Sequence, residues 1–250
     1  MENKYIFTVF YQNSKFLAHS NLYGHDICIV CDEEDDRPPN CLFTSPHLSS
    51  LNNPEEIWAR ALTLLSLYNG IANLYCTIND DYDDTSNQKL VKMFIWNKFV
   101  DITPPNKFDI AQSYPFDDAL VLDTTFLSIK NRFAYLINLS KTENDLLHIL
   151  LQLGNGLEWT NLYSIFDSIR TYSKKINKDY FKNILADSGY SETDIHAFTG
   201  TVNNYGVLGV KARHGQLGFG IPQKTLNLKK SQILILSICK SYIKLTYSVE

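Results

Sequence analysis

The sequence predicts an α+β protein, in which a small N-terminal antiparallel sheet with a buried helix is followed by a C-terminal helical bundle. Three observations predict this class. Residues 1–50 contain segments that alternate between apolar and polar side chains as strands do, residues 57–75 carry apolar side chains at helical spacing, and the pattern is helical again beyond about residue 120. We therefore expect an N-terminal α+β part over residues 1–120 and a C-terminal helical bundle over residues 121–250, either as two domains or as one continuous domain.

The N-terminal sheet is predicted from three alternating segments at residues 4–11, 15–20 and 26–31. The acidic, proline-containing segment "DEEDDRPPN" at residues 32–40 is expected to end this part of the sheet, because neighbouring acids repel one another and prolines donate no backbone hydrogen bond. Two further short strands are expected within residues 89–103.

The first helix is expected to begin at Pro54. Asn53 can cap it, and Glu55 and Glu56 lie where the helix dipole favours negative charge. Its later part belongs to a charge-free stretch, residues 61–79, which approaches the length of a membrane span. That stretch contains Asn, Thr, Ser and Gly, whose polar groups would need partners in lipid, so we expect a buried helix and no membrane contact.

The C-terminal helices are predicted from caps and periodicity. Thr142 with Asp145, and Ser191 with Asp194, fit the capping-box pattern ahead of apolar runs. The helix between them is expected to place on one apolar face Trp159, Leu162, Tyr163, Phe166 and Ile169. A final amphipathic helix is expected over residues 228–247.

Charge and cysteine content limit the classes of function. The formal net charge of −4, with both signs spread through the chain, provides no basic field, so nucleic acid is possible as a partner only at a local surface, whereas a protein partner is expected. The five cysteines are odd in number and "MENKYIFTVF" shows no signal-peptide pattern, so we expect no disulfide framework and a cytoplasmic location. The sequence contains no phosphate-binding loop or dinucleotide fingerprint, and no cofactor is expected.

A zinc site is suggested by the spacing of His25, Cys28 and Cys31, with Cys41 and His47 further along the chain. A strand through this segment would place Cys28 and Cys31 on opposite faces, so both could not bind one ion. We therefore expect buried strand cysteines and no metal site.

The segment from Asn203 to His214 is the candidate site. Arg213-His214-Gly215 matches the tripeptide of histidine phosphatases, but no histidine follows it to complete that site. Metal-independent ribonucleases of the HEPN type place an Arg and a His a few residues apart on one helix, whereas adjacent residues on a helix point about 100° apart. A non-standard ribonuclease site would use Arg213 to bind phosphate, His214 as general acid or base, and Asn203 or Asn204 to orient it.

Two other interpretations apply to the same residues. In a structural interpretation, the side chains of Arg213 and His214 hydrogen-bond to open carbonyl groups where the preceding helix ends. In a binding interpretation, an anionic ligand or a partner is recognised by Asn203, Asn204, Tyr205, Arg213 and His214.

Two segments of the C-terminal half, "GLEWTNLYSIFDSIR" and "FTGTVNNYGVLGVKARHG", carry a further pattern. The second contains N-x-x-x-x-G-x-x-A-R-H at Asn204, Gly209, Ala212, Arg213 and His214. This pattern resembles a family of uncharacterised bacterial and phage-borne proteins. The resemblance implies a bacterial or phage origin and supplies no reaction. Our first hypothesis is a non-catalytic interaction or regulatory subunit of a bacterial cytoplasmic complex, with antiphage defence as one setting, and the alternative is a ribonuclease-like effector that uses Arg213 and His214.

Overall fold

The computed structural model describes residues 4–10, 22–23, 26–32, 40–76, 89–95, 100–102, 114–120, 132–215 and 220–249. The chain divides into two compact units, which we call unit 1 (Met1–Gly154) and unit 2 (Asn155–Glu250). Strands and helices share unit 1, whereas the regular structure described in unit 2 is helical, so the α+β class is confirmed.

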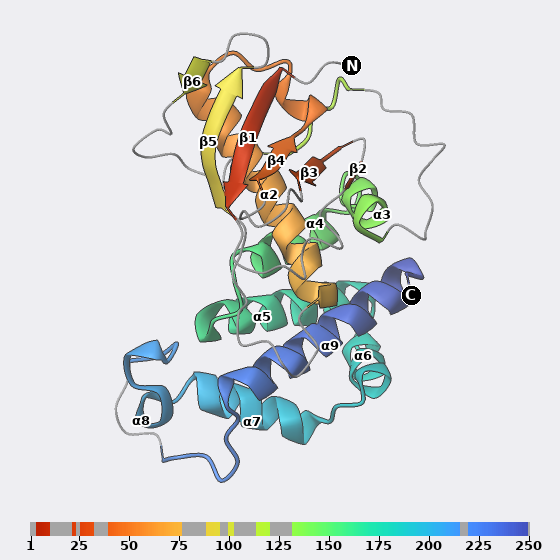
Figure 1. The fold of residues 1–250 in the computed structure, drawn as a ribbon. Helices are drawn as coiled ribbons and strands as arrows, with labels where there is room; N and C mark the ends of the chain where they lie inside the picture. Colours follow the sequence, from red (N-terminus) through yellow and green to blue (C-terminus); the bar gives the residue numbers. More distant parts are fainter. Residues whose placement is uncertain are drawn as a thin grey trace. The chain divides into compact units, whose positions relative to one another are not determined.

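Unit 1 contains one antiparallel sheet. Over the residues described, six strands pair in the order β2-β3-β4-β1-β5-β6 (Figure 1). The strands are β1 (Tyr5–Phe10), β2 (Leu22–Tyr23), β3 (Cys28–Asp32), β4 (Asn40–Thr44), β5 (Lys89–Ile95) and β6 (Val100–Ile102). β1, β3 and the two strands within residues 89–103 were predicted, and residues 15–20 lie outside the described part of the chain.

The prediction that residues 32–40 end this part of the sheet is wrong. The chain returns as β4, which lies between β3 and β1. Its inward side chains Cys41 and Phe43 are buried, and Leu42 between them is exposed. Five residues give too few alternations to identify a strand next to prolines, and pairing on both sides supplies what the local pattern lacks.

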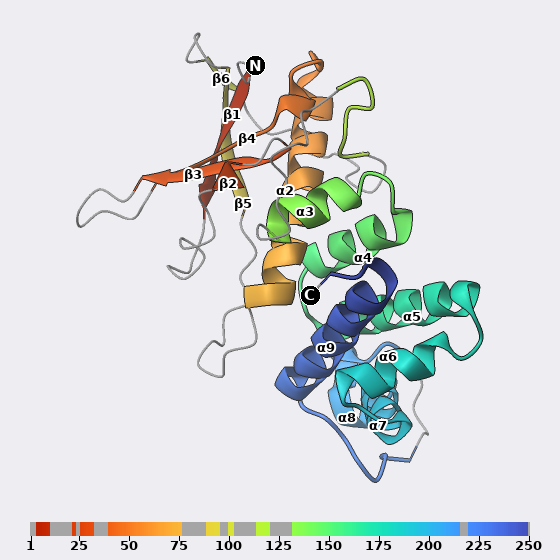
Figure 2. The ribbon, with the colours of Figure 1, turned by 90° about the vertical axis from the view of Figure 1, so that its right-hand side faces the viewer.

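Helix α2 (Pro54–Cys76) covers one face of the sheet, as Figure 2 shows. The ring of Phe7 on β1 meets the Trp58 ring edge-on at a centroid distance of 5.0 Å, and Phe43 joins them at 6.0 Å from Phe7. The predicted cap is present, because the Glu55 backbone N–H donates to Asn53 Oδ1 at 2.9 Å.

The boundary between the units falls later in the chain than the predicted boundary near residue 120. Helices α3 (Arg132–Leu139) and α4 (Asn144–Gly154) pack against α2 and therefore belong to unit 1. Their helical periodicity resembles that of the following helices, so the sequence pattern groups them with unit 2, although their apolar faces are buried in unit 1.

Two glycines allow α2 and α4 to approach closely. A Cβ added to Gly70 on α2 would overlap the carbonyl oxygen of Leu150, and a Cβ added to Gly154 on α4 would overlap the carbonyl oxygen of Ser66. Both obstacles are backbone atoms, which cannot rotate away. The contact between these helices therefore requires glycine at both positions.

Unit 2 is built from helices. They are α5 (Trp159–Ile176), α6 (Tyr180–Ser188), α7 (Glu192–Val202), α8 (Tyr205–Leu208), the 3-10 helix η4 (Gly209–Lys211) and α9 (Leu228–Tyr247). α9 occupies the predicted range and lies alongside α5 and α6 in both ribbon views (Figures 1 and 2). The predicted face of α5 is buried, apart from a partly exposed Tyr163.

The two predicted capping boxes have different outcomes. Ser191 and Asp194 form the complete box at the start of α7. Thr142 instead donates its hydroxyl to the carbonyl oxygen of Leu139 at 3.2 Å, and α4 begins two residues later at Asn144. The same sequence pattern therefore marks a helix start at Ser191 and a turn at Thr142.

The cysteines depart from the expectation of unbridged strand cysteines. Cys41 is disulfide-bonded, whereas Cys28 and Cys239 carry free thiols. In the pairing of β3 with β4, the residue opposite Cys41 is Cys31. An odd cysteine count therefore did not exclude a bridge.

A helix that spans a bilayer must be both long and apolar. None of the helices in the described ranges has both the length and the apolar content that such a span requires.

Candidate functional site

The predicted segment borders a pocket of about 460 Å³ in unit 2. The pocket is lined by His196, Thr199, Gly200, Asn203, Asn204, His214, Gly220 and Pro222. Three parts of the chain supply this lining. They are α7 with the residues at its C-terminal end, His214, and the segment from Gly220 to Pro222 that leads to α9. Pockets of this size hold small ligands or one or two side chains of a partner.

The structure brings three of the five predicted residues to the pocket. Asn203, Asn204 and His214 line it, and Tyr205 and Arg213 are not among the lining residues. Tyr205 begins α8 with its side chain partly exposed. The five residues predicted from the sequence are therefore divided between the pocket wall and its surroundings.

Arg213 lies beside the pocket in an exposed position. Its guanidinium carbon is 4.0 Å from the centroid of the Tyr163 ring, which is the geometry of a cation–π contact. Its Nη1 donates to His214 Nε2 at 3.3 Å, so the two predicted side chains contact each other directly. The stacked ring limits the positions that the guanidinium can adopt.

In the structural interpretation, the side chains of Arg213 and His214 hydrogen-bond to open carbonyl groups at the end of α7. Among the described residues, the contacts of these side chains do not include such bonds. The link to the end of α7 is made by main chain, because the Arg213 backbone N–H donates to the Val202 carbonyl at 2.9 Å. Within the described part of the chain, the side-chain contacts of this pair are those with Tyr163 and with each other.

Two amide oxygens of the pocket residues have no hydrogen-bond donor. Asn204 is 4% exposed, and its Nδ2 donates to the Gly220 carbonyl at 3.0 Å, while its buried Oδ1 accepts nothing. The Oδ1 of Asn203 is also buried and also accepts nothing. Each such group costs about 1–3 kcal/mol of stability. The pocket wall therefore carries two acceptors that the free protein leaves unsatisfied.

The chemical groups of the lining are suited to binding. His196 and His214 are the titratable residues of the lining. The Thr199 hydroxyl is engaged, since it donates to the Ile195 carbonyl at 2.9 Å. The residues that line the pocket in the described part of the chain include no carboxylate and no thiol, so they supply two imidazoles but no strong nucleophile.

The acid closest in sequence to this lining is already paired. Asp194 binds Lys224 Nζ at 2.9 Å and accepts from the Ser191 hydroxyl at 2.7 Å. Hydrogen bonds from Lys224 first, and then from Ser191, lower the pKa of Asp194 to about 2. The charge of Asp194 is therefore balanced by Lys224 and not by the cations near residue 213.

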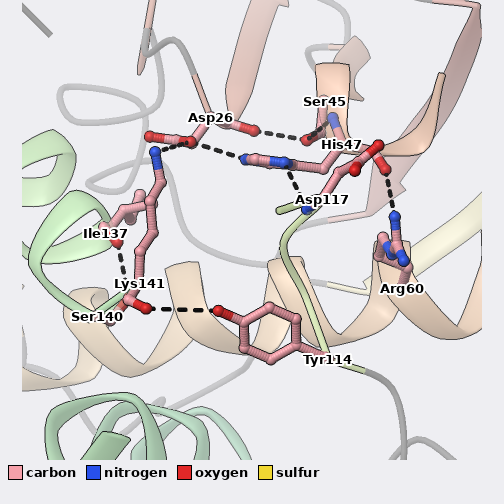
Figure 3. A network of polar contacts seen from close by, with 9 residues as sticks. All are labelled: Asp26, Ser45, His47, Arg60, Tyr114, Asp117, Ile137, Ser140 and Lys141. Atoms are coloured by element: carbon pink, nitrogen blue, oxygen red, sulfur yellow. Dashed lines mark hydrogen bonds and ion pairs between the residues drawn. The ribbon is translucent and has the colours of Figure 1, made fainter. Parts of the chain in front are cut away.

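A second polar cluster lies in unit 1 and centres on His47 (Figure 3). Its Nδ1 accepts from the Asp117 backbone N–H at 3.0 Å, so the proton is on Nε2, which donates to Asp26 Oδ1 at 2.8 Å. Lys141 Nζ lies 2.6 Å from the same Asp26 oxygen, and the Ser45 hydroxyl donates to the Asp26 carbonyl at 2.6 Å. Burial raises the pKa of Asp26, but the hydrogen bonds from His47 and Lys141 outweigh it and leave that pKa below its ordinary value.

We interpret the His47 cluster as structural. His47 is 1% exposed and both of its ring nitrogens are occupied, so it has no free position for a substrate proton. The cluster connects the start of β3, the turn before α2, and the connection between α3 and α4. No sequence pattern indicated it, because Asp26, His47 and Lys141 are far apart in the chain.

The zinc set considered from the sequence is not assembled in the described residues. His47 is engaged as above, Cys41 is disulfide-bonded, and His25 lies outside the described residues. Across the described ranges, no three His, Cys, Asp or Glu side chains are grouped as metal ligands would be.

Searches of protein-family models, curated proteins and solved structures found no match to this chain. Function is therefore inferred from the geometry of its own residues.

Sequence reasoning missed five pocket residues, which are His196, Thr199, Gly200, Gly220 and Pro222. A signal for His196 exists in α7, where His196, Thr199, Gly200 and Asn203 recur at helical spacing and so share one face. Gly220 and Pro222 approach the pocket only through the path of the chain after residue 215, which has no local signature.

Proposed function

We propose that this protein is a non-catalytic interaction or regulatory subunit, and that the pocket of unit 2 is where it binds its partner. The supporting observation is the pair of buried amide oxygens on Asn203 and Asn204 that accept no hydrogen bond. A partner that donates N–H groups to them recovers the free energy that the free protein loses. Purely structural asparagines would be expected to have their oxygens satisfied.

The composition of the lining supports binding more than catalysis. Among the described lining residues the one hydroxyl, that of Thr199, donates to main chain, and no ion pair joins His196 or His214 to a carboxylate that would orient its ring. General acid–base catalysis usually relies on such an orienting group. We therefore assign the imidazoles to recognition.

One observation favours the alternative, a ribonuclease-like effector. His196 and His214 line the same pocket and Arg213 lies beside it, so two imidazoles and a guanidinium are available near one place. RNA cleavage without a metal can use one imidazole as base, a second as acid, and a cation on the phosphate. In this alternative His196 is the second general acid or base, a role for which the sequence pattern suggested no residue.

The test is co-purification of the tagged full-length protein from its own host, with bound protein quantified by mass spectrometry. His196→Trp fills the pocket mouth and Asn203→Leu removes an acceptor, and both should lose a stoichiometric partner that the unmodified protein retains. Lys175→Glu is the matched control, because Lys175 is an exposed cation beside a tyrosine ring on α5, away from the pocket lining. An unmodified protein without a partner, or variants that retain it, would contradict the proposal.

The same preparations decide between the two functions. Incubation with a synthetic single-stranded RNA should give no cleavage if the protein is a binding subunit. Cleavage that disappears in His196→Ala and in His214→Ala would establish the effector instead.

We place the complex in the bacterial cytoplasm, where antiphage defence is one setting. The disulfide at Cys41 bears on this location, since disulfides are rare in reducing compartments. The check is to quench cells in acid and to alkylate the denatured protein without reductant, because Cys41 is buried in the folded protein. A cytoplasmic protein should have a Cys41 that reacts, and a blocked Cys41 would contradict the location.

A further inference from the structure

Two exposed cations, Lys211 and Arg213, precede the lining residue His214 in the chain. The imidazoles of His196 and His214 are exposed in the lining itself. Among the described residues, the ion pairs do not include Lys211 or Arg213. A protein with a net charge of −4 thus presents a local cationic group beside a cavity. Charge complementarity favours an acidic occupant.

Two aliphatic side chains that are close in the chain to the pocket residues are unusually exposed. Val210 in η4 is 89% exposed, and Ile221, which lies between the lining residues Gly220 and Pro222, is 71% exposed. Exposed aliphatic side chains next to a cation and a concave surface are typical of protein-binding sites. They offer a partner apolar contact without any aromatic face.

The unsatisfied acceptors indicate which donor groups the occupant of the pocket must carry. Asn203 Oδ1 and Asn204 Oδ1 need N–H or O–H donors, and they come from consecutive residues. An extended peptide backbone presents an N–H donor at every residue other than proline. One such segment can donate to the amides, place carboxylates near Arg213, and lay aliphatic side chains on Val210 and Ile221.

We propose that the occupant of the pocket is an extended segment of a partner protein that is acidic and contains aliphatic residues. This inference rests on the proposed function and names the chemistry of its partner. Arg213 is the central contact, because its stacking on Tyr163 holds the guanidinium in place before binding, which reduces the entropy lost on binding.

Single-stranded RNA fits the same surface less well. Bases bind such proteins by stacking on exposed aromatic faces, and the face of Tyr163 nearest the pocket segment is occupied by Arg213. Val210 and Ile221 offer no stacking surface. RNA is therefore the competing outcome of the experiment.

The experiment pans a displayed library of random peptides against the immobilised full-length protein. Sequences rich in Asp, Glu and aliphatic residues should be enriched. The best peptide, made synthetically with a fluorescent label, should bind about tenfold more weakly to Arg213→Glu, and also when its own acids are replaced by amides. Lys175→Glu, which reverses a cation beside Tyr172 on α5, should bind as the unmodified protein does.

Each result has a distinct meaning. A library with no enriched peptide, or one whose enriched peptides lack acids, overturns this inference. If such non-acidic peptides are nevertheless blocked by His196→Trp, the proposed binding function stands and only the partner chemistry is wrong. If enriched peptides bind His196→Trp and Asn203→Leu unchanged, the pocket is not the binding site and the proposed function fails.

The RNA outcome is tested with labelled oligouridylate. If it binds more tightly than every peptide, and its binding requires Arg213, the inference is overturned in favour of RNA. Circular dichroism of each variant identifies any loss of fold.

Discussion

Asn203 ends α7 with an amide oxygen that is buried and accepts no hydrogen bond. Asn203→Leu keeps the branched shape of the side chain and removes the unsatisfied group, so we expect the free energy of unfolding of the free protein to rise by about 1–3 kcal/mol. Urea denaturation followed by circular dichroism measures this. The same variant should bind its partner more weakly.

Thr201 provides the contrast, because it lies between the pocket residues Gly200 and Asn203 in the chain but is itself fully buried. Its buried hydroxyl donates to the Ala197 carbonyl at 2.7 Å and accepts from the Leu226 backbone N–H at 3.0 Å. Thr201→Val should therefore destabilise the protein by about 1–3 kcal/mol, because it leaves the Leu226 N–H without an acceptor. If Asn203→Leu destabilised to the same extent as Thr201→Val, Asn203 would be structural.

Asp26 makes the stability of unit 1 depend on pH. Its pKa in the folded state lies below the ordinary value of 3.8, so its ionised form stabilises the fold above the unfolded pKa. This contribution is lost as the pH falls through the folded pKa. Asp26→Asn should reduce the free energy of unfolding by about 3 kcal/mol at neutral pH, because it removes the anion from a buried pair.

Denaturation of both proteins across a pH series checks this prediction. The difference between them should shrink as the pH falls below about 4. Asp167→Asn, at an exposed position on α5, is the control and should change stability little at any pH. A difference for Asp26→Asn that stays constant down to the acid limit would contradict the prediction.

The pocket residues show which parts of a site can be predicted from the sequence. Asn203, Asn204 and His214 could be predicted because they stand in a short segment with glycines and few apolar residues. His196 could have been found from its helical spacing to Asn203. The His47 cluster could not be predicted, because its members come together only through the packing of α2, α3 and β3.

At the scale of elements, the contact between α2 and α4 depends on two residues without side chains. Gly70→Ala and Gly154→Ala each place a methyl group on a backbone carbonyl oxygen. We expect each to lower the free energy of unfolding by about 3 kcal/mol or to prevent folding. Thermal denaturation monitors both variants, and Gly215→Ala, where an added Cβ meets nothing within 4 Å, is the control. Wild-type stability in Gly70→Ala would show that the helices can separate at no cost.

Helices were more predictable than strands. α9 and the start of α2 follow from periodicity and caps, which are local properties of the chain. β4 was missed because a strand of five residues gains its stability from its neighbours β3 and β1. The glycine contact has no signature in periodicity, since Gly70 fits an apolar helix as well as alanine would.

At the scale of the whole molecule, the division after Gly154 predicts which fragments fold. Residues 155–250 expressed alone should be helical, unfold cooperatively and bind the acidic peptide. A fragment of residues 121–250 begins near the boundary predicted from the sequence and carries α3 and α4 without α2. It should aggregate, because Leu146 and Leu150, which are buried in unit 1, would be exposed.

Size-exclusion chromatography and circular dichroism distinguish the two fragments. A monomeric, stable 121–250 fragment together with an unfolded 155–250 fragment would contradict the observed division. The sequence did not reveal this boundary because helical periodicity shows that a segment is amphipathic but not which core receives its apolar face.

The position of α9 also affects synthesis of the protein. α5 and α6 pack against α9, which begins only at Leu228, so both emerge from the ribosome before their partner exists. Until residues 228–247 have left the exit tunnel, apolar side chains such as Ile165 and Ile184 stay uncovered in the nascent chain. Unit 1 can close while translation continues, whereas unit 2 can complete its core only after α9 has emerged.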